Sequence, residues 1–299
     1  MTLRNAPRIA FIGFGEAGQA IASGLREEGI AEIAAWDILF PKPEGGRLKA
    51  AGARAGIRLA SSAADAVAGC DIVIAAVTAA SNLEAAQSVA PHLAGNPYYL
   101  DINSVSPGRK IATAALLDGK ARYVDTAVIA PIHPKRHRTP LLIAGPSANS
   151  VAPLLAELEM QFKIVSDETG KAAAIKMIRS VMIKGMEALT YECFLAAARA
   201  GLLDEVTASL KNNYPGIDWT ETATYNLERM ASHGDRRAAE MEESAATLRE
   251  LGLDPLMTTG TVAHQREMGH LGKSDAVQSM LDKDRADILA AIHKIKFND

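Results

Sequence analysis

Residues 8–18 read RIAFIGFGEAG, an apolar run that leads into a glycine-rich turn. The turn matches the pattern G-x-G-x-x-G over Gly13-Phe14-Gly15-Glu16-Ala17-Gly18. Between a strand and a helix, the first glycine permits a tight turn, the second the close approach of a pyrophosphate, and the third close helix–strand packing. The N–H groups that open the helix then bind the anion. The stretch therefore predicts a dinucleotide-binding domain, and a turn with a purely structural role is the alternative.

Short apolar runs alternate with helical patterns through the first half of the chain. We expect strands within 8–15, 30–37, 71–77, 98–103, 121–129, 141–145 and 163–166, and helices within 16–29, 61–70, 81–95 and 106–119. This alternation predicts a parallel, doubly wound sheet. From residue 169 onward only helical patterns and short turns follow, beginning with one long helix. We therefore predict a Rossmann-type α/β domain over 1–165 and an all-α domain over 166–299 that begins with a long interdomain helix.

Composition and charge argue against several kinds of partner. A formal net charge of −3 over 299 residues provides no basic field for nucleic acid or an anionic membrane. Cys70 and Cys193 lie far apart, and neither they nor the seven histidines show metal-ligand or disulfide-framework spacing. The chain shows no signal-peptide pattern and no apolar stretch long enough to span a bilayer. We expect a cytoplasmic protein that binds a small molecule and no metal.

Residues at the ends of two further strands are expected to contact the cofactor. Asp37 ends the second predicted strand, where a carboxylate can accept hydrogen bonds from the adenosine ribose. Its charge would repel a 2′-phosphate, which favours NAD, but Lys42 and Arg47 follow closely and leave NADP open; a turn aspartate is the alternative. Val77 and Thr78 follow the next central strand and are placed to line the nicotinamide side, because ligands bind beyond the carboxyl ends of such strands.

Four segments together resemble the β-hydroxyacid dehydrogenases, the family that contains 3-hydroxyisobutyrate dehydrogenase and 6-phosphogluconate dehydrogenase. They are the glycine loop, LDINSVSPG (100–108), YVDTAVIAPIHP (123–134) and TGKAAAIKMIRS (169–180). The resemblance covers nearly the whole chain. It implies that Lys176 is the catalytic lysine and that Ser104 contacts the substrate, although a turn or helix-cap serine is an equal alternative at position 104. It also implies a homodimer formed through the helical domain.

The chain departs from the family pattern where the substrate would bind. Ile129-Ala130-Pro131 stands in place of a substrate-binding Ser-Gly-Gly, and Arg179-Ser180 stands where an asparagine usually follows the lysine. Arg237 aligns with a lysine of the family and could bind a carboxylate; the alternative is a helix-face charge paired with a nearby glutamate. The stretch 123–134 resembles the family's substrate segment, and the basic run at 135–138 that follows it is either a solvated loop or an anion contact. The resemblance therefore implies an outlying branch whose substrate cannot be transferred.

Lys176 lies on a polar stripe of a predicted amphipathic helix, which by periodicity alone indicates a solvated face. The polar stripe continues through Ser180, Lys184 and Glu187, and the apolar stripe opposite holds Ile178, Met182 and Leu189. The resemblance instead assigns Lys176 to proton transfer, which requires a neutral amine. An ordinary lysine has a pKa of about 10.4, so partial burial or a nearby cation such as Arg179 is expected to lower the pKa of Lys176.

These observations predict an NAD(P)-dependent oxidoreductase that acts on a small β-hydroxy acid or a related alcohol or carbonyl, with Lys176 as general acid/base. A substrate that carries a carboxylate is expected. Two alternatives remain open. The same lysine could serve a lyase or an oxidative decarboxylase, since removing a proton from a β-hydroxyl can lead to cleavage of a carbon–carbon bond. The chain could also be a non-catalytic sensor that binds a dinucleotide.

Overall fold

A computed structural model describes residues 7–297 of the protein. The chain divides into two compact units, one ending at Lys176 and the other beginning at Met177. The division falls inside helix α7 (Lys171–Ala200), later than the boundary near 165 that the sequence suggests. The physical reason is that the first turn of α7 is hydrogen-bonded to the sheet through Asp125, so it belongs with the first unit.

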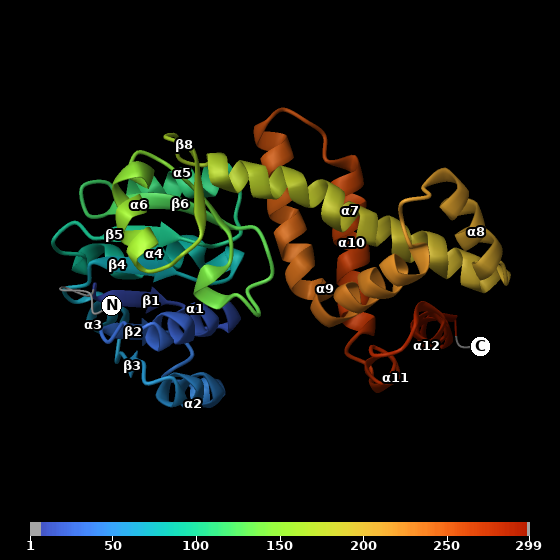
Figure 1. Cartoon of the computed structure of the whole chain (residues 1–299), viewed down its shortest axis with the longest axis horizontal. Helices are drawn as coiled ribbons and strands as arrows, with labels where there is room; N and C mark the ends of the chain where they lie inside the picture. The colour runs from blue at the N-terminus through green and yellow to red at the C-terminus, as the bar shows by residue number, and fades with distance from the viewer. Residues whose placement is uncertain (1–6, 298–299) are drawn as a thin grey trace. The chain divides into compact units, whose positions relative to one another are not determined.

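The first unit is built on one eight-stranded sheet, drawn in blue to yellow-green in Figure 1, with the strand order β3-β2-β1-β4-β5-β6-β7-β8. The strands are β1 Ile9–Ile12, β2 Ile33–Trp36, β3 Arg58–Leu59, β4 Ile72–Ala75, β5 Tyr98–Asp101, β6 Arg122–Val128, β7 Leu141–Ala144 and β8 Phe162–Ser166. The helices are α1 Glu16–Glu27, α2 Gly46–Arg54, α3 Ala63–Val67, α4 Asn82–Val89, α5 Pro107–Leu116 and α6 Ala148–Glu157. The predicted Rossmann-type α/β fold is confirmed.

The central strands form because their residues are apolar on both faces. The sequences IAFI, IVIA and YYLD of β1, β4 and β5 are buried along their whole length. Phe11 and Leu100 face a core that includes side chains of α1 and α6, whereas Ala10 and Tyr99 face a core that includes side chains of α3 and α4. Strands covered on both faces are continuously apolar rather than alternating, and the short apolar runs in the sequence are of this kind.

The sheet is not wholly parallel, which corrects one expectation. Strand β7 pairs with β6 in the antiparallel sense, with Asp125 opposite Ala144 and Val128 opposite Leu141. The connection over 129–140 contains only the one-turn 3₁₀ helix Arg136–Arg138, so the chain returns from the edge where β6 ends without a crossover. A parallel partner would need a crossover connection, usually a helix. Strand β8 is again parallel to β7 because α6 supplies that crossover.

Three elements of the first unit are absent from the sequence-based expectations, namely α2, β3 and α6. Strand β3 has two residues and lies at the edge of the sheet, so it leaves little periodic pattern. Helix α6 contains Pro153, a residue that normally argues against a helix interior. For β3 and α6, the local sequence pattern alone is therefore too weak to predict the element, which forms through its tertiary contacts.

Over residues 177–297, the second unit contains helices and no strand, as the sequence predicts. After α7 come α8 Leu203–Asn213, α9 Trp219–Glu250, α10 Leu256–Leu271, α11 Asp275–Gln278 and α12 Arg285–Phe297. Its core includes Phe194 and Met230. Helices α9 and α10 cross closely at Gly234 and Gly269, where a Cβ on either residue would overlap the backbone of the other helix. Within residues 7–297, no helix combines the length and apolar character needed to cross a membrane.

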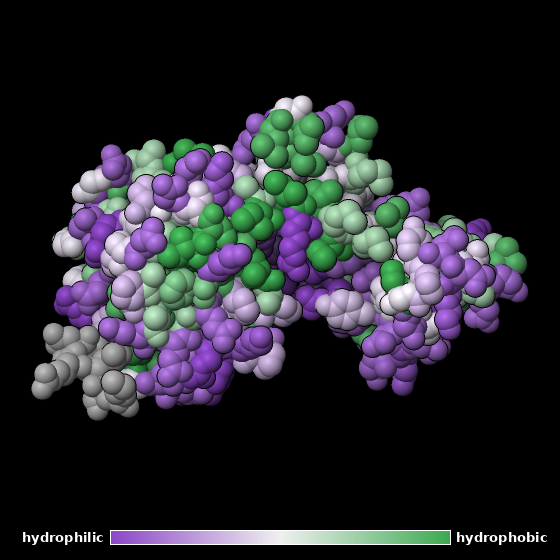
Figure 2. Space-filling model, turned by 45° about the horizontal axis from the view of Figure 1, so that its top comes forward, coloured by the Kyte–Doolittle hydropathy of each residue, from purple (hydrophilic) through white to green (hydrophobic). Residues whose placement is uncertain are grey.

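In the part of α7 that belongs to the second unit, the polar face is buried and the apolar face is exposed, the reverse of what periodicity predicts. Ser180, Lys184 and Glu187 are buried, whereas Ile178, Met182 and Leu189 on the other side are exposed, Met182 by 67%. The buried polar groups have partners in α9 and α10, so the helix buries ion pairs and leaves apolar side chains uncovered. Figure 2 shows further hydrophobic side chains gathered on the surface of this unit, including at the turn between α9 and α10.

Candidate active site

The glycine loop between β1 and α1 has the geometry that its pattern predicts. Gly13 has φ +90°, and a Cβ there would overlap the carbonyl oxygen of Ala76. A Cβ on Gly18 would lie 2.6 Å from the carbonyl oxygen of Gly13, so this glycine is needed for close helix–strand packing. Gly15, in contrast, has nothing within 4 Å of its Cβ position and directly precedes α1. The loop is therefore tight at Gly13 and Gly18 and open at Gly15, as a pyrophosphate cradle requires.

Asp37 has a structural task in addition to its predicted contact with the ribose. Its Oδ2 accepts a hydrogen bond from the Phe14 backbone N–H at 2.7 Å, and its Oδ1 accepts one from the Leu39 N–H at 2.9 Å. The carboxylate thus joins the loop after β2 to the middle of the glycine loop. Each carboxylate oxygen has a second acceptor position, so the predicted ribose contact stays chemically possible while the side chain holds the loop in shape.

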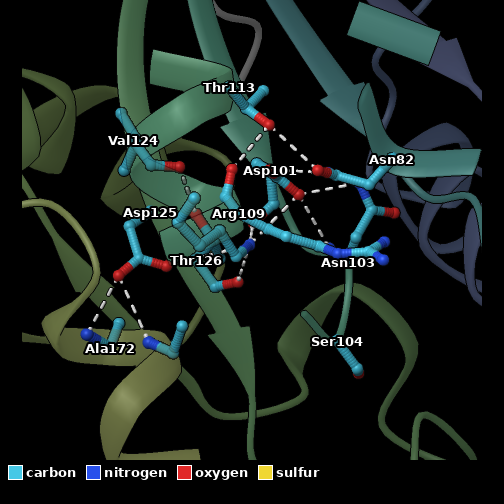
Figure 3. Close-up of polar contacts among 12 residues, drawn as sticks. Asn82, Asp101, Asn103, Ser104, Arg109, Thr113, Val124, Asp125, Thr126 and Ala172 are labelled. Carbon is cyan, nitrogen blue, oxygen red and sulfur yellow. Dashed lines mark hydrogen bonds and ion pairs between the residues drawn. The ribbon is translucent and has the colours of Figure 1, made fainter. Parts of the chain in front are cut away.

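Val77 and Ser104 belong to neighbouring loops that a buried asparagine connects. The Val77 backbone N–H donates to Asn103 Oδ1 at 2.7 Å. Asn103 in turn donates from its backbone and side chain to Asp101 Oδ1, at 3.0 and 2.7 Å. Asp101 is fully buried at the carboxyl end of β5. The side chain of Asn103 therefore holds the loop after β4 to the loop after β5. Figure 3 shows Asn103 beside Asp101.

Asp101 is the centre of a larger buried polar cluster. Its Oδ2 accepts hydrogen bonds from Asn82 Nδ2 at 2.9 Å and from the Tyr123 hydroxyl at 2.8 Å. The ammonium of Lys110, with no exposed surface, lies 3.1 Å from Asp101 Oδ1 and 3.7 Å from Asp125 Oδ1. Burial and the two neighbouring carboxylates raise the pKa of Tyr123 well above its ordinary value. The cluster therefore keeps its phenol protonated as a donor.

Asp125 connects this cluster to the start of α7. Its Oδ2 accepts three backbone N–H groups, from Gly170 at 3.0 Å, Ala172 at 3.0 Å and Ala173 at 3.2 Å. Figure 3 shows the carboxylate of Asp125 directed at the backbone of Ala172. Burial raises the pKa of Asp125, while the charge of Lys110 and the helix N–H groups act in the opposite direction. A carboxylate at a helix N-terminus is stabilised by the unsatisfied N–H groups there.

The structure brings together two predicted site residues from distant parts of the chain. Lys176 Nζ donates a hydrogen bond to Ser104 Oγ at 2.6 Å. Both side chains are half-buried. An amine and a hydroxyl in contact at the carboxyl edge of a dinucleotide-binding sheet can bind and exchange a proton with a substrate oxygen.

Ile129 and Ala130 of the substrate segment directly follow strand β6, whereas the basic run at 135–138 pairs with two glutamates, one in α1 and one directly after it. Ile129 and Ala130 are half-buried, and the Ile129 N–H donates to the Pro140 carbonyl at 3.2 Å, which extends the pairing with β7. In the basic run, Arg136 forms a two-point ion pair with Glu27 of α1, both contacts 2.6 Å. Arg138 pairs with Glu28 at 2.7 Å. These arginines pack the run on α1, which explains their presence without an anionic ligand.

Three residues predicted to bind substrate lie in the second unit. Arg179 is exposed and Ser180 is buried, with Lys184 Nζ 3.4 Å from Ser180 Oγ. Arg237 forms a two-point ion pair with the buried Glu187, in which its Nε donates over 3.0 Å. The partner is therefore Glu187 rather than the glutamates that follow Arg237 in the sequence. The substrate contacts proposed for Arg179 and Ser180 stay predictions, and Arg237 is part of the packing of its own unit.

Sequence reasoning missed the buried groups that support the site, namely Asp101, Asn103, Lys110 and Asp125. The available signal was a charged residue at the end of, or inside, an otherwise apolar strand, as in YYLD and RYVDTAV. Buried charges are rare unless paired, so such residues indicate a partner, but the sequence does not show which one. Among residues 7–297, no group of three or more His, Cys, Asp or Glu side chains has the arrangement needed for a metal ion.

Two sequence families match parts of the chain. Residues 8–103 match the family described as NADP oxidoreductase, coenzyme F420-dependent. Residues 197–268 match a domain of unknown function, DUF1932. The first match covers the glycine loop, Asp37, Val77 and Asn103, and it supports an oxidoreductase with a nicotinamide-dinucleotide fold.

Solved structures extend the likeness over the whole chain. A conserved hypothetical protein from Sinorhizobium meliloti 1021 is 35% identical, with 97% of each chain covered and a TM-score of 0.77. A conserved protein of unknown function, structurally similar to 3-hydroxyacid dehydrogenases, is 30% identical over 88% of this chain and 97% of its own, with a TM-score of 0.69. The 3-hydroxyisobutyrate dehydrogenase of Mycobacterium tuberculosis is 16% identical, covers 98% of this chain and 100% of its own, and shares the fold with a TM-score of 0.69. From these likenesses and from the glycine loop and helical second unit described above, it follows that the chain belongs to the β-hydroxyacid dehydrogenase family.

Proposed function

We propose that this chain is an NAD(P)-dependent dehydrogenase for a small β-hydroxy acid or a related alcohol, with Lys176 as general acid/base. The observation that carries the proposal is the 2.6 Å hydrogen bond from Lys176 Nζ to Ser104 Oγ. In this bond, an amine and a hydroxyl are in contact at the carboxyl edge of the sheet, the edge that also carries the glycine loop. These two groups could bind the hydroxyl of a substrate alcohol and accept its proton.

The glycine loop and Asp37 are the residues that would hold the cofactor. The open position at Gly15 and the N-terminus of α1 suit a pyrophosphate, and Asp37 suits a ribose. The nicotinamide ring supplies the acceptor or donor of hydride. An anionic residue at the ribose favours NAD over NADP, because the 2′-phosphate of NADP would approach the carboxylate of Asp37. In this arrangement, Gly15 would lie against the pyrophosphate of the cofactor and Asp37 against the adenosine ribose.

Lys176 would move the proton that accompanies hydride transfer. In the direction of oxidation, the neutral amine accepts the hydroxyl proton of the substrate as the carbon–oxygen double bond forms; in reduction, the ammonium returns that proton. Ser104 would orient the same oxygen, because a hydroxyl both donates and accepts hydrogen bonds. The two residues therefore share one task, which is to hold a substrate oxygen and change its protonation.

The test compares the wild-type protein with Lys176→Ala and with Lys171→Ala, an exposed lysine of the same helix, as matched control. Each is supplied with NAD or NADP and a panel of β-hydroxy acids, and the absorbance of the reduced cofactor is followed. We expect Lys176→Ala to lose about 100-fold or more in kcat, the contribution typical of general acid/base catalysis, with cofactor binding retained. The control should match wild type.

Other outcomes of the same experiment identify the alternatives. Equal turnover by wild type and Lys176→Ala would remove the lysine from the mechanism. Tight cofactor binding without turnover on any substrate would identify a sensor. Product formation without net reduction of the cofactor would identify a lyase.

A homodimer formed through the second unit is the second part of the proposal. It is supported by the exposed apolar side chains of α7, Ile178, Met182 and Leu189, because a large uncovered apolar surface is typical of an interface. Light scattering measures the mass of the particle, with Met182→Glu as the test variant. We expect a dimer that this charge weakens; a wild-type protein that stays monomeric at all concentrations would contradict the proposal.

A further inference from the structure

Asp125 fixes the start of α7 from the middle of a strand. It is fully buried in β6, and one of its oxygens accepts hydrogen bonds from the N–H groups of Gly170, Ala172 and Ala173. These N–H groups lie at the first turn of the helix, where the helix offers them no carbonyl partner. Gly170, which precedes the helix, has φ +96° and is packed against Pro107, so that a Cβ would lie 3.2 Å from the Pro107 Cβ. The first turn of α7 is thus held between β6 and the start of α5, which follows Ser104 by three residues.

A displacement of that first turn reaches Lys176 directly. Lys176 lies four residues after Ala172, slightly more than one helical turn, so the two residues share a face of the helix about 6 Å apart along its axis. The intervening residues are in regular α-helix. Since a helix moves as a stiff element over one turn, the hydrogen bonds of Asp125 act on the same stiff segment that carries Lys176.

The other oxygen of Asp125 connects the same helix to the rest of the site. Asp125 Oδ1 has no hydrogen-bond partner and lies 3.7 Å from Lys110 Nζ. Lys110 also contacts Asp101, at 3.1 Å from Oδ1, and Asp101 holds Asn103, whose side chain accepts from the Val77 N–H. One buried ammonium thus lies between the carboxylate that anchors α7 and the carboxylate that anchors the loops carrying Val77 and Ser104.

The burial of this cluster argues for a role beyond stability. Two carboxylates and one ammonium without exposed surface carry a large desolvation penalty, and apolar residues of similar size often give an equally stable core. What an apolar core could not supply is directed contact with three N–H groups of a helix and, through Asn103, with the N–H of Val77. Fixed direction is what a proton-transfer pair needs, because small displacements of a catalytic group cause large losses in rate.

We propose that Asp125 is a positioning residue that, together with Lys110 and Asp101, sets the contact between Lys176 and Ser104. The inference rests on the proposed function, in which that pair handles the proton of the substrate. Asp125 touches neither group of the pair and acts through the backbone of α7.

The first experiment uses Asp125→Asn, which keeps the size of the side chain and removes its charge. Asp218→Asn is the matched control, because Asp218 Oδ1 likewise accepts two backbone N–H groups at the start of a helix, α9, at 3.0 Å each. We expect Asp125→Asn to lower kcat roughly 10- to 100-fold, with little change in KM or in cofactor binding. The control should lose thermal stability only. Equal kcat for Asp125→Asn and wild type would overturn the proposal.

A double-mutant comparison shows whether the effect passes through Lys176. In a protein that already carries Lys176→Ala, adding Asp125→Asn should cause no further loss in kcat, because the group that it positions is gone. A loss of the same factor in both backgrounds would show that Asp125 acts by another route and would overturn the proposal.

A second measurement does not depend on activity. The rate at which acetic anhydride modifies Lys176 is compared with that of Lys163, an exposed lysine of β8, by mass spectrometry of peptides. We expect Asp125→Asn to raise the Lys176 rate relative to Lys163, since the hydrogen bond to Ser104 is loosened, and Asp218→Asn to leave the ratio unchanged. An unchanged ratio in Asp125→Asn would contradict the positioning role even if no substrate of the protein were found.

A second variant covers the case in which Asp125→Asn does not fold. Gly170→Ala leaves the buried cluster intact and displaces the start of α7 through the contact with Pro107. It should change the kcat and the acetylation ratio in the same direction as Asp125→Asn. Wild-type values for both in a folded Gly170→Ala protein would overturn the link between the helix start and Lys176.

Discussion

Lys176 and Ser104 are 72 positions apart in the sequence, and a hydrogen bond of 2.6 Å joins the Nζ of one to the Oγ of the other. Ser104 follows β5, whereas Lys176 lies in the second turn of α7. The pair forms because the carboxyl end of a central strand meets the start of a helix from much later in the chain.

The pair predicts the effect of removing the hydroxyl. Ser104→Ala should lower kcat/KM about tenfold, which corresponds to about 1.4 kcal/mol, a typical value for one hydrogen bond. Steady-state kinetics with the best substrate of the panel measure it. Ser106→Ala is the control, because Ser106 Oγ caps α5 and should affect stability alone. Unchanged kcat/KM in Ser104→Ala would exclude the serine from the site.

The glycine loop allows a matched pair of variants that separates folding from binding. Gly13→Ala puts a Cβ against Ala76 at φ +90°, so it should lower the free energy of unfolding by about 1–3 kcal/mol. Gly15→Ala meets nothing within 4 Å and should fold normally, yet weaken cofactor binding, because its methyl group occupies the pyrophosphate space. Thermal unfolding and titration with NADH measure the two effects. Normal cofactor affinity in Gly15→Ala would show that the loop is only structural.

Asp37→Asn tests the choice of cofactor. The amide has one acceptor oxygen, so it keeps only one of the two backbone contacts, with Phe14 or with Leu39, and it removes the negative charge. We expect the ratio of NAD to NADP affinity to fall by about tenfold or more. This corresponds to a difference of about 1.4 kcal/mol in binding free energy, as expected for the loss of a charge-assisted hydrogen bond. Dissociation constants for both cofactors, measured on both proteins, give the ratio. If the ratio stays constant, Asp37 does not contact the ribose.

Arg237 and Glu187 test whether an ion pair in the second unit serves packing. Arg237→Ala leaves the carboxylate of Glu187 buried with Gln265 as remaining partner, so the free energy of unfolding should fall by about 3–5 kcal/mol. Replacing both residues with methionine should recover part of that loss. Denaturant unfolding measures each variant. A substrate-binding role would instead raise KM and leave stability intact.

His137 predicts a dependence of stability on pH. Its ring is buried with no hydrogen-bond partner on either nitrogen, and burial, followed by the charge of Arg138, lowers its pKa from the ordinary value of about 6.5, against the opposite effect of Glu28. Below that value the unfolded chain takes up a proton that the folded chain does not, so stability decreases as the pH falls toward the folded pKa. His137→Leu should reduce this decrease. Unfolding curves between pH 7 and pH 5 measure it, and identical pH profiles would contradict the assignment.

Local patterns predicted much of the first unit because its strands are buried on both faces. Short apolar runs separated by helical periodicity follow directly from such burial, and the glycine spacing follows from one tight turn. The direction of β7 could not be predicted in this way, since LLIA reads equally well in either sense. The length and content of the connection before it decide the direction, and no α-helix forms there, only the 3₁₀ turn Arg136–Arg138.

The orientation of α7 shows where periodicity is insufficient. Its pattern has a polar side and an apolar side, and ordinary reasoning exposes the polar one. In the second unit the polar side finds Glu240, Arg237 and Gln265 on neighbouring helices and is buried instead. Periodicity distinguishes two faces of a helix, but the partners available in space determine which face is inside.

Taken alone, the amino-acid sequence determined a dinucleotide-binding first unit, a helical second unit, and Lys176 as a residue at the start of the long helix, because each of these depends on interactions between residues close in the chain. Tertiary structure decided that Lys176 meets Ser104, that Asp125 anchors the helix that carries it, and that Lys110 lies between Asp125 and Asp101. Those contacts join segments that are distant along the chain. They form because a buried charge is costly unless it is paired, and only the folded chain brings the partners together.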